Sequence, residues 1–134
     1  MLMLPLIAIV IVGLLCACGA SVAPAPTPST KRLTEADTGR SIELRGGDKL
    51  EITLPGNPTT GFQWDVSVGD TAILRPSGEP EFEPSSSAVG GGGKFTLRFA
   101  AVGTGQMGLT LIYHRPFEKD VPSDQTFDVT VTVR

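Results

Sequence analysis

Apolar side chains recur at every second position through most of the chain after residue 41, which is the period of a strand that buries one face. Three runs in the second half each place four apolar side chains on one face. They are Phe95–Ala101, Met107–Tyr113 and Phe127–Val133, and shorter runs occupy residues 42–44, 50–54 and 62–68. Since no window carries a convincing helical stripe, the pattern predicts strands throughout.

Glycine and proline clusters separate these runs, at residues 46–48, 55–58, 90–93 and 103–105, and again at Pro116 and Pro122. Six or seven strands cannot each hide an apolar face in one open sheet, so two sheets packed face to face are expected. The sequence predicts an all-β fold, an immunoglobulin-like antiparallel β-sandwich of six to eight strands. Both cysteines precede residue 19, so the sandwich has no disulfide between its sheets.

Composition narrows the function classes. A length of 134 residues with 40% hydrophobic and 19% charged side chains fits one globular domain. The formal net charge of −3 provides no basic stripe for phosphates, so no nucleic-acid partner is expected. No cysteine lies in the body of the chain to form a thiolate metal site, and we expect no metal and no cofactor.

The first 17 residues are almost wholly apolar. The stretch is too short to cross a bilayer comfortably and is typical of a signal peptide. It ends in Leu15-Cys16-Ala17-Cys18, which resembles a bacterial lipobox. The resemblance implies cleavage before Cys18, lipidation of that cysteine and attachment to a membrane of the bacterial cell envelope. A plain secretory peptide or an uncleaved anchor is the alternative.

Residues 18–32 are rich in Pro, Ala, Ser and Thr and lack periodic apolar positions. Such a composition is typical of an extended, semi-rigid tether. We therefore divide the chain into a lipoprotein signal peptide (1–17), a tether (18–32) and one folded domain (33–134).

One segment between two predicted strands has an unusual composition. It reads Asn57-Pro58-Thr59-Thr60-Gly61-Phe62-Gln63-Trp64. Proline fixes its own φ and restricts the residue before it, β-branched threonines are stiff, and glycine allows the chain to turn back. These properties predict a short, rigid, uncharged protrusion. The segment resembles the NPTTG[YF]xW motif of the chagasin family of cysteine-protease inhibitors at every fixed position.

Two further segments resemble motifs of the same family, in the family's order. The run Gly90-Gly91-Gly92-Gly93 resembles its GxGG motif, and Arg115-Pro116-Phe117-Glu118 resembles its RP[WF]E motif. An arginine and an exposed aromatic beside proline also suit an interface, because they offer a large contact area with little rotamer entropy to lose. The resemblance covers residues 33–134.

The resemblance implies a function and a site. The protein would be a reversible, tight-binding inhibitor of papain-family cysteine proteases, would act as a monomer, and would not be an enzyme. The three loops would gather at one end of the sandwich, with the Asn57–Gly61 loop in the protease cleft and Thr59 closest to the catalytic Cys and His. Trp64 would support that loop from the core. The protease-binding residues would be Asn57, Pro58, Thr59, Thr60, Gly61, Phe62, Gly90, Gly91, Gly92, Gly93, Arg115, Pro116 and Phe117.

Two other classes of function are alternatives to an inhibitor. An enzyme would depend on His114, the only histidine, which has no nucleophile motif beside it, or on Glu79, Glu81 and Glu83, which prolines interrupt. The stronger rival is a non-inhibitory binding module of the cell envelope, because sandwiches serve many functions.

Overall fold

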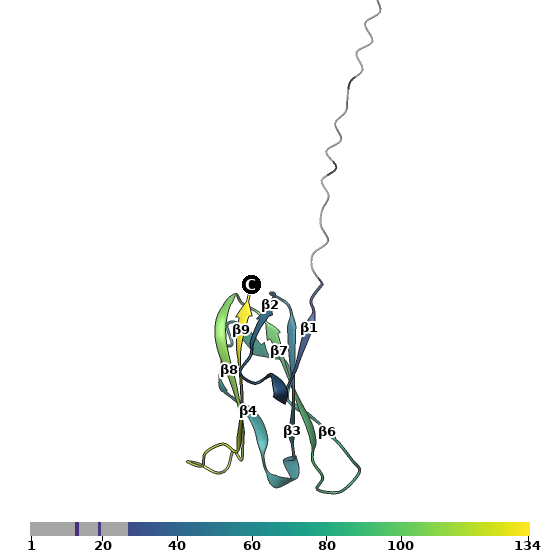
Figure 1. The fold of residues 1–134 in the computed structure, drawn as a ribbon, viewed down its shortest axis with the longest axis vertical. Coiled ribbons are helices and arrows are strands. Elements are labelled where there is room, and N and C mark those ends of the chain that lie inside the picture. The colour runs from purple at the N-terminus through teal and green to yellow at the C-terminus, as the bar shows by residue number, and fades with distance from the viewer. Residues whose placement is uncertain (1–12, 14–18, 20–26) are drawn as a thin grey trace, which may run out of the picture.

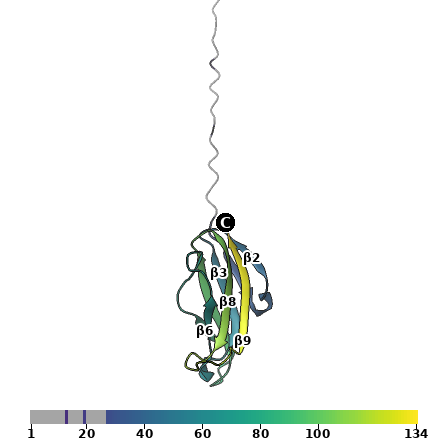
Figure 2. The same ribbon diagram turned by 90° about the vertical axis from the view of Figure 1, so that its left-hand side faces the viewer.

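A computed structural model describes residues 27–134, together with Gly13 and Gly19, and within this part the chain forms two packed sheets (Figures 1 and 2). The first sheet consists of β1 (Thr30–Thr34), β3 (Lys49–Gly56), β5 (Leu74–Pro76), β6 (Glu81–Pro84) and β7 (Gly93–Ala101). The second consists of β2 (Ser41–Leu44), β4 (Gln63–Val68), β8 (Gly105–His114) and β9 (Gln125–Val133). Two short 3-10 turns, η1 (Glu35–Asp37) and η2 (Pro58–Thr60), complete the described elements.

The strand order confirms the predicted sandwich and corrects its strand count. The first sheet has the order β1-β3-β7-β5, with β6 also paired to β7, and the second has the order β2-β9-β8-β4. Strand β5 pairs with residues 99–101 of β7 and β6 with residues 93–96, so both occupy the same edge. Residues 77–80 divide that edge, and Pro80 among them has no N–H to donate. The described chain therefore has nine strands where six to eight were expected.

The expectation of purely antiparallel sheets is wrong, because each sheet contains one parallel pair. Strand β1 runs parallel to β3, and β2 runs parallel to β9. Parallel neighbours need a connection that crosses to the other end of the sheet, and the chain supplies it by passing from β1 through η1 and β2 in the opposite sheet before it enters β3. Both sheets are thus mixed.

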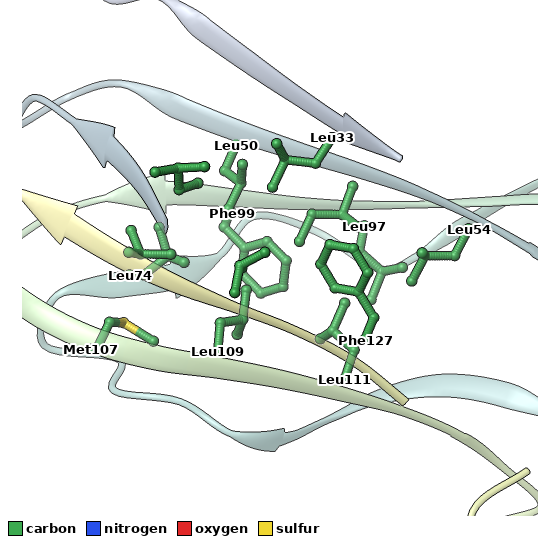
Figure 3. Close-up of a cluster of buried hydrophobic side chains, with 14 of the residues drawn as sticks. Leu33, Leu50, Leu54, Leu74, Leu97, Phe99, Met107, Leu109, Leu111 and Phe127 are labelled. Carbon is green, nitrogen blue, oxygen red and sulfur yellow. The ribbon is translucent and has the colours of Figure 1, made fainter. Parts of the chain in front are cut away.

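The core lies between the sheets and consists mainly of the predicted stripes of β2, β3, β7, β8 and β9, together with Leu33 of β1, Trp64 of β4 and Leu74 of β5 (Figure 3). Leu50, Ile52, Leu111 and Val131 have no exposed surface. The stripe predicted for residues 62–68 fails after Trp64, since Val66 is 42% and Val68 is 54% exposed. A register shift between these two valines in β4, an edge strand, turns the end of the strand away from the core.

The folded part begins earlier than Leu33. Strand β1 starts at Thr30, and the N–H of Ser29 donates to Oδ1 of Asp48 at 2.9 Å, so the expected tether overlaps the first strand. The N–H of Arg45 donates to the other carboxylate oxygen of Asp48, also at 2.9 Å. These hydrogen bonds, that from Ser29 first, lower the pKa of the buried Asp48 carboxyl from its ordinary value of 3.8.

The signal peptide predicted for residues 1–17, the lipidated Cys18 and most of the expected tether lie outside the described residues. In the described part of the chain, no helix is long and apolar enough to cross a membrane, and no group of His, Cys, Asp and Glu side chains is placed to hold a metal ion.

The two ends of the sandwich carry different parts of the chain. Figure 1 shows the C-terminus and the start of β1 at one end, and the connections β3–β4, β6–β7 and β8–β9 at the other. Figure 2 shows the same separation from the side. We call the first the termini end and the second the loop end.

Candidate functional site

The three segments singled out in the sequence meet at the loop end, which confirms that part of the prediction (Figure 1). The side-chain amide of Asn57, between β3 and β4, donates to the carbonyl of Gly90 at 2.8 Å. The guanidinium of Arg115, after β8, donates through Nε to the carbonyl of Thr60 at 3.0 Å. The Asn57 loop thus lies in the middle and is tied by a hydrogen bond to each of the other two.

The Asn57 loop is a single 3-10 turn held by its own first residue. Oδ1 of Asn57 accepts from the N–H of Thr59 at 3.1 Å and from the Thr59 hydroxyl at 2.6 Å. Pro58 occupies the first helical position, where its missing N–H costs nothing. Gly61 closes the turn in the left-handed region, with φ of 83°, and its N–H donates to Pro58 at 3.1 Å. The residue types therefore define the loop's shape locally.

Pro58, Thr59 and Thr60 are exposed at the tip, as predicted. Their hydroxyls cannot donate a hydrogen bond to a partner, because both already donate to atoms of Asn57. The Thr59 hydroxyl donates to the Asn57 side chain, and the Thr60 hydroxyl donates to the Asn57 carbonyl at 2.7 Å. What the tip presents is therefore two methyl groups and two oxygen atoms that still accept hydrogen bonds.

An aromatic cluster supports the base of the loop. Trp64 is 3% exposed and donates its indole N–H to the Pro55 carbonyl at 3.0 Å, in keeping with the supporting role expected of it. Tyr113 packs against Trp64 and stacks on Phe62, with centroid separations of 5.1 and 5.0 Å, and its hydroxyl accepts from the N–H of Asn57 at 2.7 Å. Phe62 is half-buried between Tyr113 and Arg115, so only part of its ring is open to a partner.

Sequence reasoning missed two residues of this base. Tyr113 was assigned only to a core stripe, although a buried tyrosine hydroxyl needs a partner and so marks a polar contact. Gly56 was assigned only to the turn at residues 55–58, although it lies within β3. A Cβ at Gly56 would lie 2.6 Å from the Phe95 ring and 3.1 Å from Tyr113, so only glycine lets β3 reach the loop at this point.

The third loop presents an exposed aromatic side chain on a fixed turn. The Glu118 N–H donates to the Arg115 carbonyl at 3.1 Å, and Arg115 forms an ion pair with Glu118 at 2.7 Å. The same guanidinium lies 4.5 Å from the centroid of the Phe62 ring. Pro116 is exposed, and Phe117 is 71% exposed with one edge against Gly61, where a Cβ would lie 2.9 Å from its ring.

His114 is a half-buried strand residue directly before the third loop. It is the last residue of β8, and its Nε2 lies 2.7 Å from Oδ2 of Asp65 on the neighbouring strand β4. The Gln63 amide donates to the same carboxylate at 2.8 Å. This pairing joins two strands of the second sheet and contains no nucleophile.

The glycine loop is divided in its roles. Gly90 has φ of 77° and its carbonyl accepts from Asn57, while Gly91 is half-buried and Gly92 is exposed. Gly93 is buried within β7, and a Cβ there would overlap the Glu83 carbonyl of β6. Gly93 therefore allows β6 and β7 to lie close together. Gly90 and Gly92 are the two exposed glycines of this loop, and they are the ones that a partner can contact.

An immunoglobulin-like sandwich with three interlocked loops at one end is the class of protein that these observations define. The model of the chagasin family peptidase inhibitors I42 matches residues 43–131 of the chain. The chain therefore belongs to the chagasin family of peptidase inhibitors.

Individual relatives agree with this assignment. Amoebiasin-1 of Entamoeba histolytica is 32% identical over 105 residues, which cover 76% of this chain and 98% of the relative. Chagasin of Trypanosoma cruzi is 29% identical over 102 residues, covering 73% of this chain and 93% of that protein. The solution structure of Amebosin superposes with a TM-score of 0.64 at 31% identity, over 81% of this chain and all of that one. The relatives thus consist almost wholly of the domain described above.

Proposed function

We infer that this protein is an inhibitor of papain-like cysteine proteases and that it acts by inserting the Asn57–Gly61 loop into the active-site cleft. The observation that carries the inference is the preformed tip at Thr59 and Thr60, which is exposed, uncharged and fixed by hydrogen bonds in a chain of the chagasin family. The alternative of a non-inhibitory binding module has no observation of the described residues in its favour.

The hydrogen bonds of the loop explain how it would block a protease without being cut. A peptide bond is cleaved when its carbonyl is held near the nucleophile with donors aimed at the developing oxyanion. The carbonyl oxygens of Asn57, Pro58 and Thr60 already accept hydrogen bonds within the domain. The chain is also coiled into a 3-10 turn. Presenting any of these three carbonyls to the nucleophile would therefore require the loop to give up a hydrogen bond of its own, and cleavage at Thr59 would require the 3-10 turn to open.

The same rigidity supports tight and reversible binding. Ordering a side chain at an interface costs about 0.5–1.5 kcal/mol, and a loop that is already ordered avoids much of that cost. The flanking loops add an exposed aromatic side chain, Phe117, and the uncharged surface around Gly90 and Gly92. We therefore place Phe117 as the main flanking contact and Arg115 as the residue that holds it in register with the Asn57 loop.

A titration tests the inhibitor function. Residues 27–134 are pre-incubated with papain, and the remaining activity is followed with a fluorogenic peptide. We expect stoichiometric inhibition that is lost on dilution and leaves the Asn57–Gly61 loop uncut. The double variant Thr59→Glu/Thr60→Glu should weaken inhibition by about a thousandfold, because two buried charges would face the cleft without partners.

The matched control is Thr71→Glu/Thr104→Glu, which adds the same charge at exposed threonines far from the loops. It should inhibit like the unchanged domain. Both variants should keep the thermal unfolding of the parent to within a few degrees. Full inhibition by the Thr59/Thr60 variant would show that this loop does not enter the cleft.

For the chain as a whole, we propose a monomeric lipoprotein of the bacterial cell envelope, attached through Cys18. The apolar residues 1–17 and the Leu15–Cys18 sequence support this proposal. The test is expression of the full chain and of Cys18→Ser with radiolabelled palmitate. Label in the first and not in the second is expected, and label in neither would exclude lipid attachment at this cysteine.

A further inference from the structure

Unpaired positive charge collects at the termini end of the sandwich. Arg45 lies in the turn between β2 and β3, Lys31 near the start of β1, and Lys49 and Arg75 flank Ala100 on one rung of the first sheet. All four are exposed, and none of them forms an ion pair within residues 27–134. We call these four residues, with Val102, the basic face.

The carboxylates of the same end are all engaged. Glu43 pairs with Arg134 at 2.9 Å. Glu51 bridges Arg32 and Arg98, at 3.0 and 3.1 Å. Asp48 accepts two backbone N–H groups, and Asp70 accepts the N–H of Ala72 at 2.9 Å. Asp48 and Asp70 keep their negative charge, because backbone N–H groups are neutral, so four cations without an ion pair stand against two such carboxylates. The surplus at this end is positive, although the chain as a whole carries −3.

The excess of negative charge lies elsewhere. Six carboxylates outside the termini end form no ion pair within residues 27–134, namely Glu35, Glu79, Glu83, Asp120, Asp124 and Asp128. Two lysines of the same region, Lys94 and Lys119, form none either. Six carboxylates against two lysines leave a surplus of four negative charges outside the termini end, so the molecule is positive where the chain enters and negative beyond it, toward the loop end. An anionic surface would attract the first end and repel the second.

An exposed apolar side chain accompanies the basic residues. Val102 is 49% exposed. Its N–H donates to the carbonyl of Ile73 at 2.9 Å, and Ile73 precedes Arg75 by two residues, so Val102 lies near that cation. The preceding Ala101 carbonyl accepts the N–H of Gly47, two residues from Arg45, at the same distance. A small apolar group among cations is the combination that favours the surface of an anionic bilayer.

We propose that the basic face rests on the surface of a bilayer containing anionic phospholipids. This proposal rests on the lipid attachment proposed above. The eleven residues between Cys18 and Thr30 span at most about 40 Å when extended, so the termini end stays within reach of the headgroups. A domain held this way would stand upright, with the loop end lifted by the length of β8, about 30 Å, toward a protease in solution.

The test is co-sedimentation of residues 27–134 with vesicles of phosphatidylcholine alone or mixed with phosphatidylglycerol. The relatives consist almost wholly of this domain, so it folds without the residues before it. We expect it to sediment with the mixed vesicles at about 50 mM salt and to be released as salt shortens the Debye length. Arg45→Glu/Lys49→Glu should lower the partition coefficient by at least about tenfold.

Lys94→Glu/Lys119→Glu is the matched control, since it makes the same change in net charge nearer the loop end, and it should alter partitioning by less than about twofold. No sedimentation with mixed vesicles, or an equal loss in both variants, would overturn the proposal. Papain inhibition in solution should be unchanged by Arg45→Glu/Lys49→Glu. Failure of vesicle binding therefore leaves the inhibitor function standing, and failure of inhibition does not touch the vesicle result.

Discussion

The two ends of the sandwich are both fixed by a short polar side chain that accepts backbone N–H groups, yet they serve opposite purposes. At the termini end, Asp48 is 8% exposed and both its oxygens are used, on Ser29 and Arg45. At the loop end, Asn57 fixes a turn whose tip remains exposed, and its amide also donates to Gly90.

The difference teaches where stability and function reside. The Asp48 hydrogen bonds join Ser29 to the turn at residues 45–48 and complete the fold through a buried side chain that takes no part in inhibition. The Asn57 hydrogen bonds lie within one turn and contribute little to the core, but they decide which atoms reach a protease. Changes at the two ends should therefore separate folding from inhibition.

Among single substitutions, the largest effect on inhibition is expected from Gly61→Val. A β-branched residue at φ of 83° is strained, and its Cβ would lie 2.9 Å from the Phe117 ring. Both the tip and the neighbouring loop must move, so the inhibition constant for papain should rise by about a hundredfold or more. A control at Gly39, which also has positive φ but has nothing within 4 Å of a Cβ, should keep full inhibition.

A smaller loss is expected from Asn57→Ala, which removes the acceptor for Thr59 and the donor to Gly90. Loss of such a cap costs about 1–2 kcal/mol, and we expect inhibition to weaken by about tenfold or more. Asn57→Asp keeps an acceptor for Thr59 and replaces the donor to Gly90 by a carboxylate oxygen, which also adds a negative charge. If the two variants inhibit equally, the link to the glycine loop is the part that matters, and the turn does not need its cap.

Asp48→Asn should lower the melting temperature at neutral pH and leave inhibition at that pH unchanged. The native hydrogen bonds lower the pKa of Asp48 below 3.8, so its stabilising effect is complete above that pH and is lost as the pH falls through the lower native pKa. Thermal unfolding of the variant should therefore approach that of the parent only in strong acid. A constant difference in melting temperature from neutral pH to pH about 2.5 would contradict this account.

The smallest effect is expected from Gly92→Ala. The nearest atom to a Cβ there is the Gly56 carbonyl at 3.4 Å, and the backbone is not in the left-handed region. Inhibition should change by less than about threefold. Gly93→Ala, by contrast, would push against the Glu83 carbonyl and should lower the melting temperature. Equal behaviour of the two variants would remove the distinction between contact and structural glycines in this loop.

Much of this arrangement could be predicted from the sequence, because alternation and turn chemistry are local. The stripes of β7, β8 and β9 became strands with their predicted faces buried, and the residue types of the Asn57 loop defined its stiffness. The sandwich and the meeting of the three loops followed from these strands together with the family resemblance.

Other features depend on contacts between distant segments, which no local pattern records. The parallel pairing of β1 with β3 depends on the chain crossing between them in sequence to form β2 in the other sheet. The exposure of Val66 follows from a register shift at an edge. The hydrogen bond between Tyr113 and Asn57 joins residues 56 positions apart, and a Tyr at the end of an apolar stripe was its only signal.

The parallel pairing of β1 also determines how the domain carries a mechanical load. The chain enters β1 at the termini end, and β3 runs directly to the Asn57 loop at the other end. A pull between residue 27 and a bound protease therefore draws the two strands past each other along their length. The five residue pairs from Thr30–Lys49 to Thr34–Thr53 are then loaded in shear and must give way together, where a pull across the strands would open them one by one. The N-terminal lipid attachment proposed above would thus load the domain in the direction in which its first sheet resists separation best.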